Sequence, residues 1–138
     1  MEQDVRWKQR FENFDRAFML LREVHERGID SLTQLEREGA IQRFEMAYEL
    51  AWKTLRDYLA HIGIEVHPVA PREVIKAAFA ARLLDDAQIW IDMMLERNRL
   101  AHNYDVDTFE LALKAIDARY YGAFSRLHAD LSAMAAEA

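Results

Sequence analysis

The residues best suited to chemistry stand close together in one stretch, Glu96-Arg97-Asn98-Arg99-Leu100-Ala101-His102-Asn103-Tyr104. An arginine keeps its charge and binds phosphate or carboxylate groups through a planar fork of N–H donors. A histidine gains or loses a proton near neutral pH. Arg97 is therefore a candidate for binding a phosphate and His102 for transferring a proton, with Asn98 and Tyr104 beside them.

Arg97 belongs to the apolar face predicted for the surrounding helix, because alternating steps of four and three join Trp90, Met94, Arg97, Ala101 and Tyr104. A buried guanidinium needs a carboxylate, a ligand anion or water, and without one it costs several kcal/mol. Glu45 and Glu49, on one flank of an earlier predicted helix, could supply this carboxylate, although two solvated glutamates are the commoner alternative for such residues. A purely structural ion pair is the alternative to a ligand role for Arg97.

Arg97 and His102 present a geometric conflict. They are five residues apart, so on a straight helix they point about 140° away from each other. Either the helix breaks before His102, or a second copy of the chain completes the site across a two-fold axis. A homodimer is the simplest prediction if the two residues act together.

Composition limits the classes of protein to consider. With 138 residues, 51% of them hydrophobic, the chain is expected to form one domain over residues 1–138. A formal charge of −6 argues against a general nucleic-acid coat but allows a local basic site. The N-terminus is charged and no uncharged run approaches the roughly 20 residues of a membrane span. We expect a cytoplasmic protein that does not enter a membrane.

The sequence gives little support for a metal or cofactor. It contains no cysteine, which removes disulfides, thiol catalysis and the commonest structural zinc sites. Asp105 and Asp107 form an Asp-x-Asp pair near His102, but Asp107 is better suited to capping a helix. No metal and no cofactor are predicted.

Apolar spacing and capping signals predict an all-α fold. Thr33 and Glu36 form a capping box, and Gly28 and Gly63 are helix stops. Pro71 suits a first helical position. Asp85 or Asp86 can cap the next helix. Residues 107–110 form a second capping box, which is expected to start the last helix. The expected helices cover about residues 4–27, 33–62, 71–81, 87–104 and 108–131, with no segment patterned as a strand. The prediction is an up-and-down four-helix bundle with one extra short helix.

Two stretches resemble a known family. From Arg97 to Tyr104 the chain has arginine and asparagine, then three residues, histidine, one residue and tyrosine. This spacing resembles the signature of HEPN domains. The stretch Arg43-Phe44-Glu45-Met46-Ala47-Tyr48-Glu49-Leu50-Ala51-Trp52-Lys53 is similar to the bacterial nucleotidyltransferase substrate-binding proteins within that group. The segments 71–75 and 83–86, followed by Trp90, fit the same branch. The resemblance covers roughly residues 32–110.

The resemblance implies a homodimeric helical bundle that pairs with a separate small nucleotidyltransferase, usually encoded next to it. The chain lacks the Gly-Ser followed by an Asp-x-Asp pair that such enzymes use, and Asp105 and Asp107 match that pair by letter only. It is therefore not expected to be that catalytic subunit. In the first function implied, it is a binding subunit: Arg97 contacts phosphate, while Asn98 and His102 shape a pocket for a nucleotide or substrate.

The alternative function is a metal-independent HEPN ribonuclease, the toxin of a toxin–antitoxin pair. His102 would then move a proton of the RNA and Arg97 would stabilise phosphate charge. The resemblance suggests Tyr104 as the hydroxyl that receives a transferred nucleotide, although simple packing of this tyrosine is an equal alternative. A ribonuclease should show a basic cleft with Arg97 and Arg99 and either Arg72 or Lys76, whereas a docking subunit should show an apolar or acidic patch.

Overall fold

A computed structural model describes residues 2–137, and within this range every regular element is helical. Six α-helices, one short 3₁₀ turn and one π-helical segment follow one another: α1 (Glu2–Arg27), η1 (Ile29–Ser31), α2 (Gln34–His61), α3 (Pro71–Ala80), α4 (Ala87–His102), α5 (Val106–Ala115), η2 (Ile116–Tyr120) and α6 (Tyr121–Ala136). None of these helices combines the length and the apolarity that a membrane span requires.

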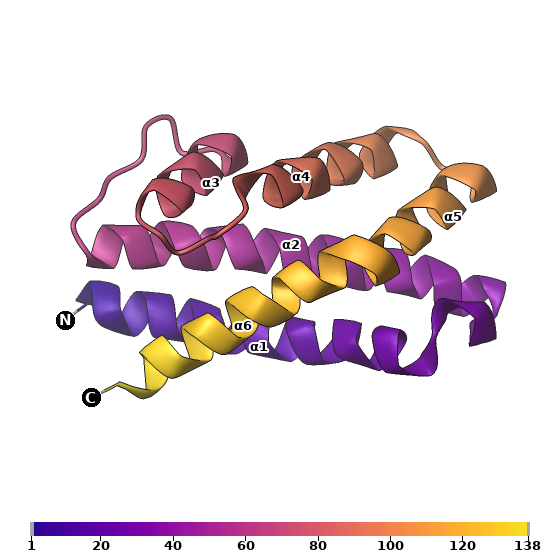
Figure 1. Cartoon of the computed structure of the whole chain (residues 1–138), viewed down its shortest axis with the longest axis horizontal. Coiled ribbons are helices and arrows are strands. Elements are labelled where there is room, and N and C mark those ends of the chain that lie inside the picture. Colours follow the sequence, from indigo (N-terminus) through magenta and orange to yellow (C-terminus); the bar gives the residue numbers. More distant parts are fainter. Residues whose placement is uncertain (1, 138) are drawn as a thin grey trace.

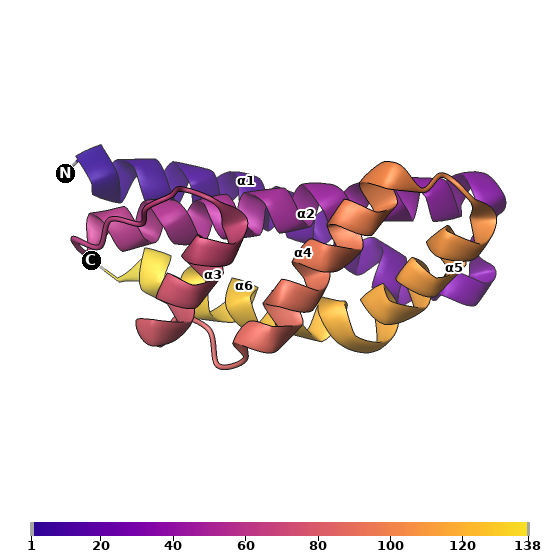
Figure 2. The ribbon, with the colours of Figure 1, turned by 90° about the horizontal axis from the view of Figure 1, so that it is seen from above.

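The helices run up and down along one long axis, as the sequence predicts. Figure 1 shows α1 and α2 side by side and antiparallel, α3 and α4 above α2, and α5 and α6 returning across the bundle. Helix α2 contacts α1, α3, α4 and α5, so it lies at the centre of the bundle. Figure 1 places α2 between α1 and the pair α3 and α4, and Figure 2, seen from above, shows α4 lying obliquely across α2. The all-α bundle is therefore confirmed.

The core is built mainly from the aromatic face of α1 and the long apolar face of α2. In the sequence, both faces repeat at steps of three and four residues, the spacing of residues that share one side of a helix. The buried residues on these faces are Trp7, Phe11, Phe14, Phe18, Leu21, Ile41, Phe44, Tyr48, Ala51 and Leu55. At the end of the second face, Ile62 lies beyond the helix and is exposed.

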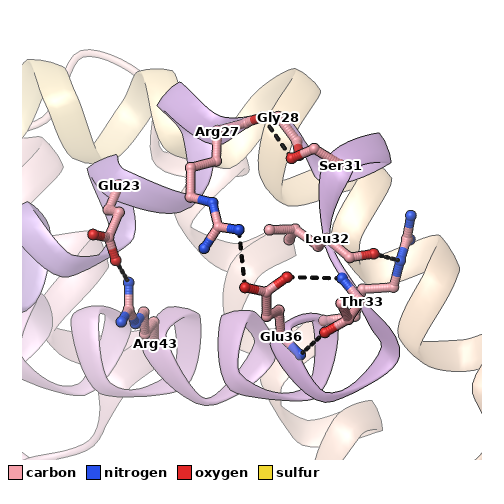
Figure 3. Close-up of polar contacts among 9 residues, drawn as sticks. Glu23, Arg27, Gly28, Ser31, Leu32, Thr33, Glu36 and Arg43 are labelled. Carbon is pink, nitrogen blue, oxygen red and sulfur yellow. Dashed lines mark hydrogen bonds and ion pairs between the residues drawn. The ribbon is translucent and has the colours of Figure 1, made fainter.

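The turn between α1 and α2 is fixed by a set of short-range polar contacts (Figure 3). Gly28 ends α1 with a positive φ of 80°, a conformation that glycine adopts without steric cost. Thr33 and Glu36 form the predicted capping box at the start of α2. Across the turn, Arg27 lies 2.9 Å from Glu36. These contacts set the antiparallel direction of the two longest helices.

The last helical run differs from the prediction in two ways. Asp105, not Asp107, caps α5, and its carboxylate accepts a hydrogen bond from the Thr108 backbone N–H at 2.7 Å. Glu110, the glutamate of the predicted capping box, instead binds Arg37 of α2 at 2.7 Å. A long-range partner for Glu110 therefore shifts the helix start by two residues.

The second difference is the π-helical segment η2, which interrupts the predicted continuous helix. A π turn adds a residue to the local repeat of the helix. Beyond it, Phe124 is fully buried and Ala123 only partly buried, while Leu127 and Leu131 keep to the buried face. The ring of Phe124 contacts Trp90 edge-on, with ring centroids 5.3 Å apart.

Candidate functional site

Helix α4 carries most of the predicted site residues, and its two ends are defined by local sequence. Asp86 caps its start by accepting a hydrogen bond from the Ile89 backbone N–H at 3.2 Å. Asn103 has extended backbone angles and ends it. Arg97, Asn98 and His102 therefore lie in its last turns, whereas Tyr104 lies in the connection to α5.

The predicted apolar face of α4 is correct at Trp90 and Met94 but is one position off from Arg97 onward. The buried residues are Trp90, Met93, Met94, Glu96 and Leu100. Steps of three and four fit this set as well as the predicted one, since neighbouring faces share the same spacing. Arg97 consequently lies at the edge of the interface with 39% of its side chain exposed. Tyr104, which was assigned to the buried face, is 84% exposed.

The buried charge of α4 is Glu96 rather than Arg97. Its side chain is only 6% exposed and lies 2.6 Å from the guanidinium of Arg99. A buried carboxylate needs such a partner, because leaving it without one costs several kcal/mol. The Arg99 backbone carbonyl in turn accepts a hydrogen bond from the Asn103 side chain at 3.0 Å. Arg99 thus makes both of these contacts with residues near the end of its own helix.

Of the two carboxylates expected near Arg97, Glu49 is in direct contact: Arg97 Nη2 lies 3.2 Å from Glu49 Oε1. Glu49 also lies 3.5 Å from Lys53 on the next turn of α2. Burial raises the pKa of Glu45, and the nearby positive charge of Arg97 offsets part of that rise. Arg97 therefore faces α2 and its carboxylates.

The other predicted site residues face outward. Asn98 and His102 are four residues apart on the exposed side of α4, and the Tyr104 side chain projects from the connection that follows. Within one chain, then, the helix neither breaks before His102 nor turns His102 toward Arg97. The geometry leaves the second copy as the way to bring the two together.

The described residues offer no metal site. No group of three or more histidine, cysteine, aspartate or glutamate side chains between residues 2 and 137 is arranged to hold a metal ion. Asp105 is used instead as a helix cap, and its hydrogen bonds from Thr108 lower the pKa of its carboxyl.

A cleft of about 350 Å³ lies away from these residues, between the α3–α4 connection, α4 and α6. Its lining includes Arg119, Gly122 and Arg126. Arg119 is held by Asp92 at 2.7 Å, and Arg126 lies 3.4 Å from both Asp85 and Asp130. Sequence reasoning missed this cleft, because its walls come from segments that are far apart in the chain.

The structure is thus an all-α bundle in which the first half of α4 is buried and the end of α4 carries the polar residues Arg97, Asn98 and His102. The chain belongs to the family described as nucleotidyltransferase substrate binding protein like, whose model matches residues 9–133. This is the family that the second-helix stretch predicts, so the resemblance is confirmed.

The chain is also similar to two individual proteins. The "Probable ribonuclease HepT" of Haemophilus influenzae is 28% identical over 82 residues, which cover 57% of this chain and 56% of that protein. The match thus spans little more than half of the relative. A crystal structure of a protein from Thermus thermophilus superposes with a TM-score of 0.69 at 28% identity, over 90% of this chain and 99% of the other.

Proposed function

We propose that this protein is a substrate-binding subunit that holds a nucleotide or nucleotide-bearing substrate for a separate small nucleotidyltransferase. Membership of the family over residues 9–133 is the observation that supports this most. The site proposed is the end of α4, where Arg97 contacts phosphate and Asn98 and His102 shape the pocket. Tyr104, exposed beside them, is the hydroxyl proposed for modification.

The contact between Arg97 and Glu49 is compatible with phosphate binding. A guanidinium has five N–H donors, and the observed contact with Glu49 runs through Nη2. Both side chains are partly exposed, so an incoming phosphate reaches Arg97 without unfolding α4. A phosphate that binds Arg97 through two parallel hydrogen bonds then competes with Glu49 for the guanidinium.

The proposal includes a homodimer. Arg97 faces α2 while His102 faces solvent, so the two residues act on one ligand only if a second copy supplies one of them. Size-exclusion chromatography with light scattering tests this directly. A monomer at micromolar concentration would contradict the shared site.

Nucleotide binding is tested by calorimetry with ATP as the probe, on wild type, Arg97→Gln and Arg119→Gln. Arg119 is a matched control, since it is also exposed and paired with a carboxylate. Wild type and Arg119→Gln should bind alike, and Arg97→Gln should lose at least tenfold in affinity, as expected for a hydrogen-bonded charge pair worth about 1.5–3 kcal/mol.

Co-expression with the proposed nucleotidyltransferase, followed by purification of the complex, tests the partner. A pair that separates during purification would contradict the subunit role.

A metal-independent ribonuclease is the second candidate, supported by the similarity to the probable ribonuclease of Haemophilus influenzae. It ranks second because the second-helix stretch is similar to the substrate-binding branch of the family, and because a formal charge of −6 does not favour a surface that engages RNA. RNA cleavage by the partner-free protein in EDTA, compared with His102→Ala, tests it. Intact mass must first show that Tyr104 is unmodified.

The two outcomes separate the candidates. Cleavage that disappears in His102→Ala would make the protein a ribonuclease and its partner an antitoxin. A folded, unmodified dimer that leaves RNA intact would support the subunit proposal.

A further inference from the structure

The cleft beside α6 is a feature of the surface that the proposed site does not use. It lies where the α3–α4 connection and the start of α4 approach α6 (Figure 2). Its volume of about 350 Å³ falls within the range of roughly 300–1,000 Å³ that is typical of binding pockets. Leu84, Trp90 and Leu127 contribute to its lining and are themselves buried. The cleft therefore has an apolar floor on which an incoming side chain can pack.

One guanidinium stands between two carboxylates at the mouth of this cleft. The side chains of Arg126, Asp85 and Asp130 line the cleft and are 64%, 68% and 48% exposed. Arg126 lies 3.4 Å from a carboxylate oxygen of each aspartate, beyond the usual N–H···O hydrogen-bond distance of about 2.7–3.2 Å. Asp85 belongs to the α3–α4 connection and Asp130 to α6. Two carboxylates on opposite walls thus share one loosely bound cation.

Negative charge exceeds positive charge around the cleft. Three aspartates and two arginines line it, and the third aspartate, Asp86, also caps α4. The second arginine, Arg119, is bound by Asp92 at 2.7 Å. With Asp92 and with Arg82 of the α3–α4 connection included, four carboxylates stand against three guanidiniums. The cleft therefore favours a cation over an anion such as phosphate.

Gly122 leaves the α6 wall of the cleft open. It is exposed, lines the cleft and lies inside a helix. A Cβ atom at this position would meet nothing within 4 Å, so packing within the chain does not require a glycine here. Glycine destabilises the interior of a helix relative to alanine. What the missing side chain provides is access to the floor of the cleft from the side of α6.

We propose that the cleft beside α6 binds an arginine or lysine side chain of the partner, the small nucleotidyltransferase. The aliphatic stem of such a side chain packs on the apolar floor, and its charged end lies between Asp85 and Asp130. Two carboxylates then face two cations. A docking subunit is expected to show an apolar or acidic patch, and this cleft combines both properties. The inference rests on the proposed function, because it assigns a surface to the partner that this function requires.

The chemistry of the cleft is tested by NMR with Nα-acetyl-L-arginine amide as the probe. The chain contains four glycines, so the amide of Gly122 is readily followed in ¹H–¹⁵N spectra of labelled protein. The probe should shift the Gly122 amide in a saturable manner and leave the Gly39 amide unchanged. Nα-acetyl-L-glutamate amide, the anionic control, should shift neither. Equal shifts with the two probes, or no shift of Gly122 with either, would overturn the proposal.

The two carboxylates are tested with the same probe. Asp85→Asn/Asp130→Asn should weaken binding of the arginine probe at least fivefold, because both of its charged contacts are lost. Asp105→Asn/Asp107→Asn removes the same charge near the opposite end of α4 and should bind the probe like wild type. Equal weakening in the two variants would overturn the proposal, since net charge alone would then explain the binding.

Docking is tested on the complex with the co-expressed nucleotidyltransferase. Gly122→Leu fills the cleft without removing a contact, and Gly39→Leu is its matched control. Gly39 is also a helical glycine at which a Cβ would meet nothing within 4 Å, but it lines a groove between α1 and α2. Gly122→Leu should weaken the complex at least tenfold in biolayer interferometry, whereas Gly39→Leu should bind like wild type. Circular dichroism should show the same helix content in all variants.

The outcomes separate this inference from the proposed function. A complex that tolerates Gly122→Leu would overturn the inference and leave the subunit role in place. Loss of the homodimer in Gly122→Leu, measured by light scattering, would also overturn it, because a second copy of the chain would then occupy the cleft. A wild type that forms no complex would reject both the docking cleft and the subunit role. Calorimetry with ATP on the same samples reports on the site at the end of α4 separately.

Discussion

The two halves of α4 differ sharply in what surrounds them. In the first half, Trp90 and Met93 are buried and the Trp90 ring contacts Phe124 of α6. In the last turns, Asn98 and His102 face solvent, and Tyr104 follows with 84% of its surface exposed. The packed half fixes where the helix points, while in the last turns only Glu96 and Leu100 are buried and the side chains of Asn98 and His102 are not packed against the core. The first half of α4 thus contributes mainly to stability, whereas its last turns carry the residues of the proposed site.

Two arginines in the exposed half repeat this contrast on a smaller scale. Arg99 contacts Glu96, whose carboxylate is buried. Arg97 contacts Glu49, whose side chain is 30% exposed. A charge partner matters more for a buried group than for a solvated one. The two arginines are therefore expected to differ in their contribution to stability, although they are two residues apart.

The largest expected effect is the loss of the packed half. Trp90→Ala should lower the free energy of unfolding by about 3–5 kcal/mol, because it removes a fully packed aromatic ring and leaves a cavity. Urea denaturation followed by circular dichroism measures this. Tyr104→Ala is the matched aromatic control and should change stability by less than about 0.5 kcal/mol. Similar losses in both variants would contradict the division of α4.

A smaller effect is expected for the arginine beside the buried glutamate. Arg99→Gln should cost about 1–3 kcal/mol at neutral pH, because Glu96 then loses its charged hydrogen-bond partner. The exposed head of Arg99 keeps this below the cost of a fully buried pair. The double variant Glu96→Gln/Arg99→Gln should recover part of the loss, as measured by the same urea titration. Additive losses in the double variant would show that the two residues are not coupled.

Arg97→Gln should affect stability less than Arg99→Gln. Its ion pair with Glu49 is partly exposed, so we expect a cost of about 0–1 kcal/mol, together with the loss of ATP affinity proposed above. A stability cost equal to that of Arg99→Gln, with ATP binding unchanged, would assign Arg97 a purely structural role.

The smallest effect concerns Glu45, whose pKa burial raises above the usual 4.5. A carboxyl with a raised folded-state pKa holds its proton more tightly when folded, so stability falls as the pH rises through the range just above 4.5. Glu45→Gln removes this cost. Its urea midpoint relative to wild type should therefore be higher at about pH 7 than at about pH 4. The opposite dependence would show that the charged form of Glu45 is favoured by folding.

The long helices could be predicted from sequence because local signals and apolar spacing agree there. In α2, the capping box at Thr33 and Glu36 and an unbroken apolar face lead to the same result. In α4 the local signals were insufficient, because two adjacent faces fit the spacing. Burial chose the face that ends at Leu100, a choice that depends on the partner helices.

Long-range contacts account for the remaining differences. The contact between Glu110 and Arg37 joins residues that are 73 positions apart, and it moves the helix cap from Asp107 to Asp105. The π segment at 116–120 has no signal in the apolar repeat. The candidate site followed the same pattern: its residue types were visible in the sequence, whereas the cleft beside α6 required the packing of segments that are far apart in the chain.

Both ends of the described chain lie at the same end of the bundle, and the connection from α4 to α5 lies at the opposite end (Figure 1). A fluorescent protein or affinity tag fused to either terminus therefore attaches far from Tyr104. Labels of this kind can report on RNA, nucleotide and partner binding without covering the residues under test. Tethering the protein to a surface by a terminus leaves the α4–α5 end facing the solution.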